Sequence, residues 1–374
     1  MADLNTNLAA LAAVAANPRA KLDEYLNAGR KVVGCFPVYT PEVLVDAAGM
    51  IPMGLWGAQT EFSHAKSYLP PFACPIMQAN MEMGITGAYR GVSAVMIPAM
   101  CDTLRNVSQD FKKGVPDITC IPFTFPQNRK IPAAMSYLVS EFTYVKEALE
   151  TICGKAIEGE DIVRSIEIYN EHNVAVRTFS ALANRHLDII TPVVRHAVMK
   201  SGQFMPKEEH TKILKEINTQ LLAMPTFDYK GKRVILTGIT AEPDQLLNIL
   251  SENNMAVVGD DLAQEMRQYR TDIPDGGKPL ERLARQWMDR SDPMAHDADI
   301  RRGDLLLGLV RENRADGVIL CLMKFCDPEE YEYPVFLETL KAANVPVLSI
   351  DVDQQPATYD QARTRIQTFC DILS

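Results

Sequence analysis

The chain has no apolar run near the roughly 18 residues of a membrane span, and it has no excess of basic side chains. Its 48 acidic and 38 basic residues give a formal net charge of −10. This balance argues against a nucleic-acid or anionic-membrane partner, because such surfaces attract basic proteins. The first 26 residues also lack the basic segment and apolar core of a secretory signal. We therefore expect a cytoplasmic protein whose partners are small molecules or other proteins.

Several common signatures of chemistry are missing as well. The sequence contains no GxGxxG, GxxxxGKS/T, HExxH or GxSxG motif, which argues against a dinucleotide fingerprint, a phosphate-binding loop, a zincin site and a hydrolase nucleophile. It contains no close Cys-x-x-Cys pair. The six histidines show no metal-ligand spacing, so we interpret them as surface or supporting residues.

Apolar strand-like runs alternate with helical patterns in two parts of the chain. The runs KVVGCFPV, MIPMGLWG, SAVMIPAM and DITCIPFTF in the first half have counterparts KRVILTGI, MAVVGDD, GVILCLM and VPVLSIDVD in the second. This repetition predicts an α/β protein with two Rossmann- or flavodoxin-like parallel-sheet domains related by pseudo-symmetry, with helical N-terminal and central segments. The expected boundaries are N-terminal helices at 1–30, a first α/β domain at 31–134, a helical segment at 135–225 and a second α/β domain at 226–374.

Two of the matched strands end in the same pair of residues, Cys followed by Asp. These pairs are Cys101 with Asp102 and Cys326 with Asp327. Open α/β sheets bind ligands at the carboxyl ends of their strands, so the two cysteines are predicted to face one another. Cys74 precedes a helix in the first half alone, since its counterpart near 298–301 has no cysteine.

Two interpretations of these three cysteines remain open. Thiolates at strand ends and helix starts suit a soft metal site for zinc, copper or an iron-sulfur cluster. Alternatively, the cysteines are small buried residues at tight turns, with the two aspartates as helix caps. The other five of the eight cysteines lie in apolar strand-like or helix-like runs and are expected to be structural; they are Cys35, Cys120, Cys153, Cys321 and Cys370.

The motifs around the three cysteines resemble the 2-hydroxyacyl-CoA dehydratase family. They read YLPPFACP at 68–75, IPAMCDTLRNVSQDFK at 97–112, FPQNRK at 125–130 and MKFCDPEEYEYP at 323–334. Further segments resemble the shorter, β subunit of these enzymes over essentially the whole chain. Within the family, the likeness points to β subunits acting on 2-hydroxyisocaproyl-CoA, with the lactoyl, phenyllactyl and 2-hydroxyglutaryl enzymes as near relatives.

The resemblance implies an anaerobic radical lyase of amino-acid fermentation that converts an (R)-2-hydroxyacyl-CoA to the (E)-2-enoyl-CoA. The β-proton is hardly acidic, so a one-electron reduction of the thioester replaces ordinary base catalysis. The resemblance also implies one 4Fe-4S cluster per chain, held by Cys74, Cys101 and Cys326 with one iron open. Implied partners are a larger homologous α subunit, which forms the heterodimer and binds the acyl group, and an ATP-dependent iron-sulfur activator protein.

Two rival functions follow from the same residues. The first is an electron-transfer subunit of an aromatic acyl-CoA reductase, which shares the cysteine arrangement. The second is a noncatalytic α/β binding module with structural cysteines. A measurement of iron content distinguishes the binding module from the iron-sulfur enzyme. Analysis of the reaction products distinguishes the reductase subunit from the dehydratase subunit.

Overall fold

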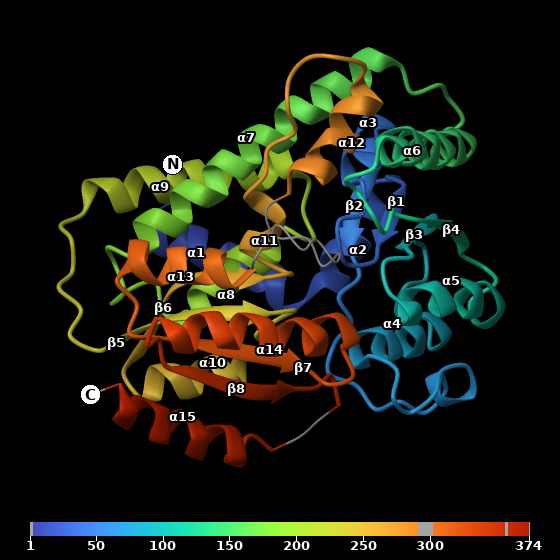
Figure 1. Cartoon of the computed structure of the whole chain (residues 1–374). Helices are drawn as coiled ribbons and strands as arrows, with labels where there is room; N and C mark the ends of the chain where they lie inside the picture. Colours follow the sequence, from blue (N-terminus) through green and yellow to red (C-terminus); the bar gives the residue numbers. More distant parts are fainter. Residues whose placement is uncertain (1–2, 291–301, 356–357, 374) are drawn as a thin grey trace.

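The computed structural model describes residues 3–290, 302–355 and 358–373, and within them the strands form two parallel sheets (Figure 1). The first sheet has the order β2-β1-β3-β4 and the second the order β6-β5-β7-β8. The strands are β1 (Val32–Cys35), β2 (Ile51–Gly54), β3 (Ala94–Pro98), β4 (Thr119–Phe123), β5 (Lys232–Gly238), β6 (Met255–Leu262), β7 (Gly317–Met323) and β8 (Val347–Val352). The identical order confirms the predicted α/β class, and its 2-1-3-4 pattern is that of flavodoxin-like sheets.

The repeat is also visible in how neighbouring strands pair. Val33 on β1 pairs with Ala94 on β3, and Val234 on β5 pairs with Gly317 on β7. The strands that the sequence matched between halves thus occupy equal positions in the two sheets. Because every pairing is parallel, the carboxyl ends of all four strands of a sheet lie at the same edge. In such folds ligands bind at this edge.

Helices cover both faces of the first sheet. One layer is formed by α4 (Pro75–Ile85) and α5 (Asp102–Gly114), and the other by α3 (Glu42–Ala47) and α6 (Pro132–Cys153). A short 3₁₀ turn, η1 (Ala65–Ser67), packs against α4. Pro75 and Pro132 begin α4 and α6, where a missing N–H costs nothing, and Gly154 ends α6 with φ of 79°.

The second sheet is covered in the same way. Helices α13 (Arg302–Asn313) and α14 (Asp327–Ala342) lie on one face, and α10 (Asp244–Glu252) and α15 (Asp360–Ile372) lie on the other (Figure 1). Two further helices, α11 (Met266–Tyr269) and α12 (Pro279–Asp289), lie between β6 and α13 in the sequence. The first half has only η1 and α4 between β2 and β3, so α11 and α12 form an inserted segment in the second half.

The remaining helices pack with one another beside the sheets. They are α1 (Leu4–Ala16), α2 (Pro18–Asn27), α7 (Gly159–Ala183), α8 (Pro192–Ser201) and α9 (Lys207–Ala223). The long α7 packs against α3 and α9, and α1 packs against α8 and α9. Leu11 of α1 therefore shares a core with Phe179 of α7 and Leu214 of α9. The domain boundaries at 30, 134 and 225 stay a prediction.

Alternating side chains of the strands divide the core of the second sheet. Val234 and Leu236 belong to a large core that continues into the first half, whereas Ile235 points to the opposite layer with Phe336 of α14. The counterpart of Cys74 near 298–301 lies outside the described residues. Within the part of the chain that the structure describes, no helix is both long enough and apolar enough to cross a bilayer.

Candidate functional site

The three predicted cysteines each stand at the start of a helix. Cys74 is the N-cap residue of α4, Cys101 of α5 and Cys326 of α14. Burial raises the pKa of Cys326, and the neighbouring thiols of Cys74 and Cys101 raise it further, so the three side chains lie within electrostatic range of one another across the two halves. Residues that follow β3 and β7, Cys101 and Asp327 among them, line one common cavity.

Backbone N–H groups of the first helical turns lie near the sulfurs. The N–H of Leu104 donates to Cys101 Sγ at 3.5 Å. The N–H groups of Met77 and Glu329 lie near enough to Cys74 and Cys326 to oppose the rise of their pKa on burial, but neither makes a hydrogen bond to the sulfur. Such donors and the positive ends of three helix dipoles stabilise thiolate anions. The arrangement fits three thiolate ligands of an electron-rich metal group.

The cysteines are held as neutral thiols when nothing is bound. Burial raises the pKa of Cys74 to about 12, and burial likewise raises the pKa of Cys101 and of Cys326 above their ordinary value. A thiol binds metal only as the thiolate, so loading this site releases protons. Within the described residues no three His, Cys, Asp or Glu side chains converge on a single metal ion. A multi-iron cluster places its ligands on separate irons, so it needs no such convergence.

A cavity of about 310 Å³ opens beside Cys101, between the two halves of the chain. Its wall includes Asp102, Arg105, Gln127, Asp327 and Tyr331. Both aspartates that follow the repeated cysteines thus border it. Their predicted role as helix caps is wrong, because the cysteines take the cap positions and each aspartate is the first residue of its helix. There a carboxylate still interacts favourably with the helix dipole.

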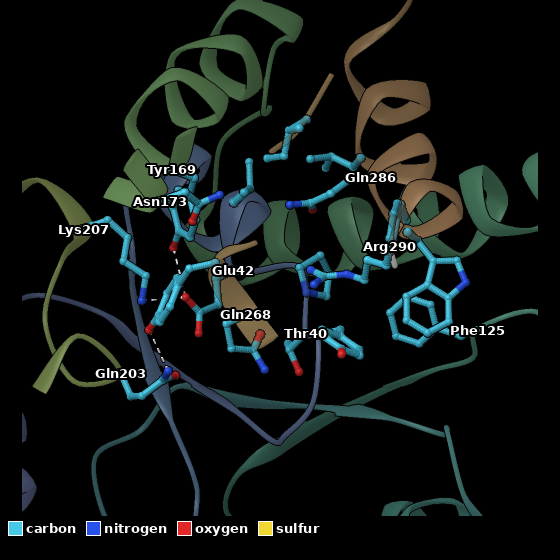
Figure 2. A pocket seen from close by; sticks show the side chains of 18 residues that line it. Thr40, Glu42, Phe125, Tyr169, Asn173, Gln203, Lys207, Gln268, Gln286 and Arg290 are labelled. Carbon is cyan, nitrogen blue, oxygen red and sulfur yellow. Dashed lines mark hydrogen bonds and ion pairs between the residues drawn. The ribbon is translucent and has the colours of Figure 1, made fainter. Parts of the chain in front are cut away.

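A second, smaller cleft of about 80 Å³ lies between the first half and α7, α9 and α12 (Figure 2). At one end Lys207 Nζ lies 3.0 Å from Glu42 Oε2, and Tyr169 donates from its hydroxyl to the same oxygen at 3.3 Å. Lys207 also donates to the carbonyl of Gly202 at 2.6 Å. The ammonium is almost fully buried, so its charge depends on these partners.

Aromatic rings form the other end of this cleft. The Arg290 guanidinium lies 4.0 Å from the centroid of the Tyr39 ring, and Tyr39 packs edge-on against Trp287. Trp287 in turn packs on Phe125, and both of these rings line the cysteine cavity as well as the cleft. Sequence reasoning missed the cleft, because its residues come from segments far apart in the chain and no spacing joins them.

The histidines differ from the surface residues that the sequence suggested. His172, His186, His196 and His210 are each at most 2% exposed. His172 Nε2 and His210 Nδ1 lie 2.8 Å apart, and His196 Nδ1 lies 2.7 Å from Glu265 Oε1. For these four histidines the surface interpretation is wrong, because the lack of metal-ligand spacing says nothing about burial. His296 lies outside the described residues.

The other five cysteines stand apart from the site. Cys321 and Cys326 are both buried, but Cys321 lies within β7 whereas Cys326 follows the end of that strand. The thiols of Cys35, Cys120, Cys153 and Cys370 donate to backbone carbonyls in their own surroundings. Cys321 is therefore a matched control for Cys326, since both are buried thiols from the same strand connection.

The sequence comparisons define a dehydratase component of the 2-hydroxyacyl-CoA type. Residues 37–373 match the family described as 2-hydroxyglutaryl-CoA dehydratase, D-component, and the chain belongs to this family. It is 44% identical to the (R)-phenyllactyl-CoA dehydratase beta subunit of Clostridium sporogenes, over 96% of each chain. It is 43% identical to the lactoyl-CoA dehydratase subunit beta of Anaerotignum propionicum, over 100% of each chain.

A third relative is the (R)-2-hydroxyglutaryl-CoA dehydratase, subunit beta, of Acidaminococcus fermentans. The identity is 37%, over 96% of this chain and 97% of that one. The predicted family and subunit type are confirmed, and the family favours an enzyme over a binding module. The expected nearest likeness to a 2-hydroxyisocaproyl-CoA enzyme is replaced by likeness to one named for phenyllactyl-CoA.

Proposed function

We propose that this chain is the β subunit of an iron-sulfur dehydratase that converts an (R)-2-hydroxyacyl-CoA to the (E)-2-enoyl-CoA. The observation that carries the proposal is three helix-capping thiols within electrostatic range of one another, one of them lining a cavity, in a chain of this family. In the proposal Cys74, Cys101 and Cys326 hold one 4Fe-4S cluster per chain, whose fourth iron has no cysteine ligand. The enzyme acts in the cytoplasm during anaerobic amino-acid fermentation.

The donor set supports this cofactor. Thiolates select iron-sulfur clusters, and N–H donors to their sulfurs are among the features that tune such clusters. A bound cluster supplies single electrons, which is the chemistry that removal of an unactivated β-proton requires. The chain contributes sulfurs from both halves, the N–H groups that face them, and the aromatic wall of Phe125 and Trp287.

We further propose that this subunit relays electrons and that a larger homologous α subunit binds the acyl group. The cleft of about 80 Å³ is smaller than the cavity of roughly 150 Å³ that binds benzene in an engineered core, and the larger cavity of about 690 Å³ beside α1, α8 and α10 has no cysteine among the described residues of its wall. The space beside Cys101 is needed for the cluster. An ATP-dependent activator protein supplies the electron. The name of the relative at 44% identity supports an aryl-bearing acyl group such as phenyllactyl.

The cofactor is tested by anaerobic purification of wild type, Cys326→Ser and Cys321→Ser. We expect about four irons per chain in wild type and in Cys321→Ser, with visible charge-transfer absorption, and loss of both in Cys326→Ser. Equal loss of iron in the two variants would contradict the assignment. An iron-free wild type would reject the cofactor.

The reaction is tested with the larger subunit, activator and ATP present, on phenyllactyl, lactoyl, 2-hydroxyisocaproyl and 2-hydroxyglutaryl thioesters of CoA. Mass spectrometry should show loss of water, with phenyllactyl-CoA turned over fastest. Reduction of an aromatic ring in a benzoyl-CoA control would instead favour the reductase function. Turnover by this chain without the larger subunit would refute the relay.

A further inference from the structure

Glu329, in the first turn of α14, faces Cys326 with its backbone and a buried ion cluster with its side chain. Its N–H and its carboxylate are both close enough to Cys326 to influence the thiol electrostatically, and the residue is 0% exposed. A buried carboxylate is costly unless it is paired and hydrogen-bonded. The position of this helix start, and hence of the cysteine, is therefore coupled to whatever holds the carboxylate.

Two buried arginines hold it. Arg302 donates from Nη1 and Nη2 to the two carboxylate oxygens, at 2.9 and 3.1 Å. Arg267 donates from Nη1 to Oε1 at 3.2 Å. Paired N–H bonds from one guanidinium fix the plane of a carboxylate as well as its position. Glu329 consequently cannot rotate or shift without breaking several charged hydrogen bonds.

Asp261 at the end of β6 anchors both arginines to the second sheet. Its carboxylate accepts from Arg302 Nε at 2.7 Å and from Arg267 Nη2 at 3.0 Å. Burial opposes its ionisation, but Arg267 and Arg302 hold the pKa of this carboxyl well below its usual range. Arg302 also donates to Thr237 on β5 at 2.8 Å. The chain of contacts thus runs from two strands, through two arginines, to the helix that begins at Cys326.

We propose that Glu329 is a positioning residue for Cys326 and that, together with Arg267 and Arg302, it sets the reduction potential of the metal group bound there. The inference rests on the proposed cluster and deepens it. Fixed charges in a poorly hydrated interior act on a nearby redox centre with little screening. A negative charge close to the cluster opposes its reduction, and a positive charge favours it.

Glu329 and Arg302 carry opposite charges, so their replacement should shift the reduction potential in opposite directions. A merely structural role would not produce this pattern. Glu329→Gln removes a negative charge and should raise the reduction potential, whereas Arg302→Gln removes a positive charge and should lower it. We expect each to change the ratio of reduced to oxidised cluster, at a fixed ambient potential, by on the order of tenfold; for a one-electron couple this corresponds to about 59 mV. Arg302→Lys keeps the charge and should restore a potential near that of wild type.

A matched control is available on the surface. Lys324 is also close to Cys326 in the sequence, but its side chain is 46% exposed and pairs with Asp353 at 2.9 Å. Lys324→Gln removes the same charge as Arg302→Gln from a hydrated position. Its potential should stay near that of wild type because water and salt screen exposed charges.

The measurement is an anaerobic redox titration of the full-length chain, followed by electron paramagnetic resonance and visible absorption, on samples whose iron content equals that of wild type. Shifts of the same sign for Glu329→Gln and Arg302→Gln, no shift for either, or an equal shift for Lys324→Gln would overturn the inference. Absence of iron in wild type would instead reject the proposed function. The two failures are therefore distinguishable.

If Glu329→Gln and Arg302→Gln lose iron, a milder variant of the same network still tests the inference. Glu332 accepts from Arg302 Nη1 at 2.6 Å, but its side chain is partly exposed, so it is easier to replace. Glu332→Gln should keep its iron and raise the potential by less than Glu329→Gln would. An unchanged potential in this variant, at full iron content, would contradict the role of the network.

Discussion

The rings of Phe125 and Trp287 lie with their centroids 4.2 Å apart, and both border the cysteine cavity and the smaller cleft. Phe125 follows β4 of the first half, whereas Trp287 belongs to α12 in the inserted segment of the second half. Both rings are almost fully buried. The contact therefore joins the two halves beside the cysteine cavity.

Replacing Trp287 by alanine should destabilise the chain. The variant removes the contacts with Phe125 and Tyr39 and leaves a cavity, at a cost of about 3–5 kcal/mol in the free energy of unfolding. Urea unfolding of the full chain followed by circular dichroism measures this. Trp287→Phe retains a ring and should recover much of the loss. An unchanged midpoint in the alanine variant would show that the rings do not join the halves energetically.

The ion pair of Lys207 and Glu42 should show strong coupling. Lys207→Met leaves the Glu42 carboxylate without its cation, and losing one member of a buried pair costs about 3–5 kcal/mol. Adding Glu42→Gln removes the unpaired charge, so the double variant should be more stable than Lys207→Met alone. A double-mutant cycle in urea gives the coupling energy. Strict additivity would mean that solvent already screens the pair.

Stability should decline on the alkaline side because of His196. Burial favours its neutral form, but Glu242 and Glu265 outweigh this and raise the pKa of His196 to about 9. The folded state thus holds a proton more tightly than the unfolded state, whose histidine has its ordinary pKa near 6.5. This contribution, a few kcal/mol, is fully present below pH 6.5 and is lost as the pH rises to about 9. His196→Gln should flatten this limb of a urea-midpoint profile, and an unchanged slope would contradict it.

The acid limb should have a different origin. Burial and the Lys207 ammonium lower the pKa of His210 to about 3, so its ring stays neutral in the folded state. The unfolded chain binds a proton there below about pH 6.5, and stability therefore falls as the pH drops from 6.5 towards 3. His210→Gln should shrink this limb while the alkaline limb persists. A profile that loses both limbs together would indicate general loss of structure instead.

Alkylation of the iron-free chain should report the burial of Cys74. Because burial raises the pKa of Cys74 to about 12, only a minute fraction is thiolate at neutral pH. Iodoacetamide labelling, followed by mass spectrometry, should be slow at pH 7 and accelerate about tenfold per pH unit. Cys153 is half-buried like Cys74 and therefore provides an internal comparison of reagent access, and Cys74 should react more slowly than Cys153. Equal rates at neutral pH would show that Cys74 is accessible without its metal group.

The placement of Cys101 and Cys326 after β3 and β7 was predictable from the sequence because it depends on topology. Parallel strands in one sheet end at the same edge, so Cys101 and Cys326 needed only the correct assignment of strands to be placed at facing edges. The cap assignment failed by one residue. Statistical preference favours aspartate as N-cap, but each cysteine takes that position and leaves Asp102 and Asp327 in the first turn.

The buried ion pairs were beyond such reasoning. Lys207 and Glu42, or Arg302 and Glu329, belong to separate elements, and each looks locally like an ordinary surface charge. Their burial is decided by how α9 packs near α3 and how α13 packs against α14. The same holds for the buried histidines, whose partners come from other helices and loops. Local sequence patterns indicate where helices and strands form. The buried ion pairs depend instead on how helices that are distant in the sequence pack together.

Cys74 and Cys101 cap helices of the first sheet, whereas Cys326 caps a helix of the second. A group bound to all three would cross-link the two halves. The halves could then separate only if the group dissociated from at least one cysteine. The rate of inactivation by oxygen would accordingly report how often the halves separate. A partner that holds the halves together would slow this inactivation without contacting the metal.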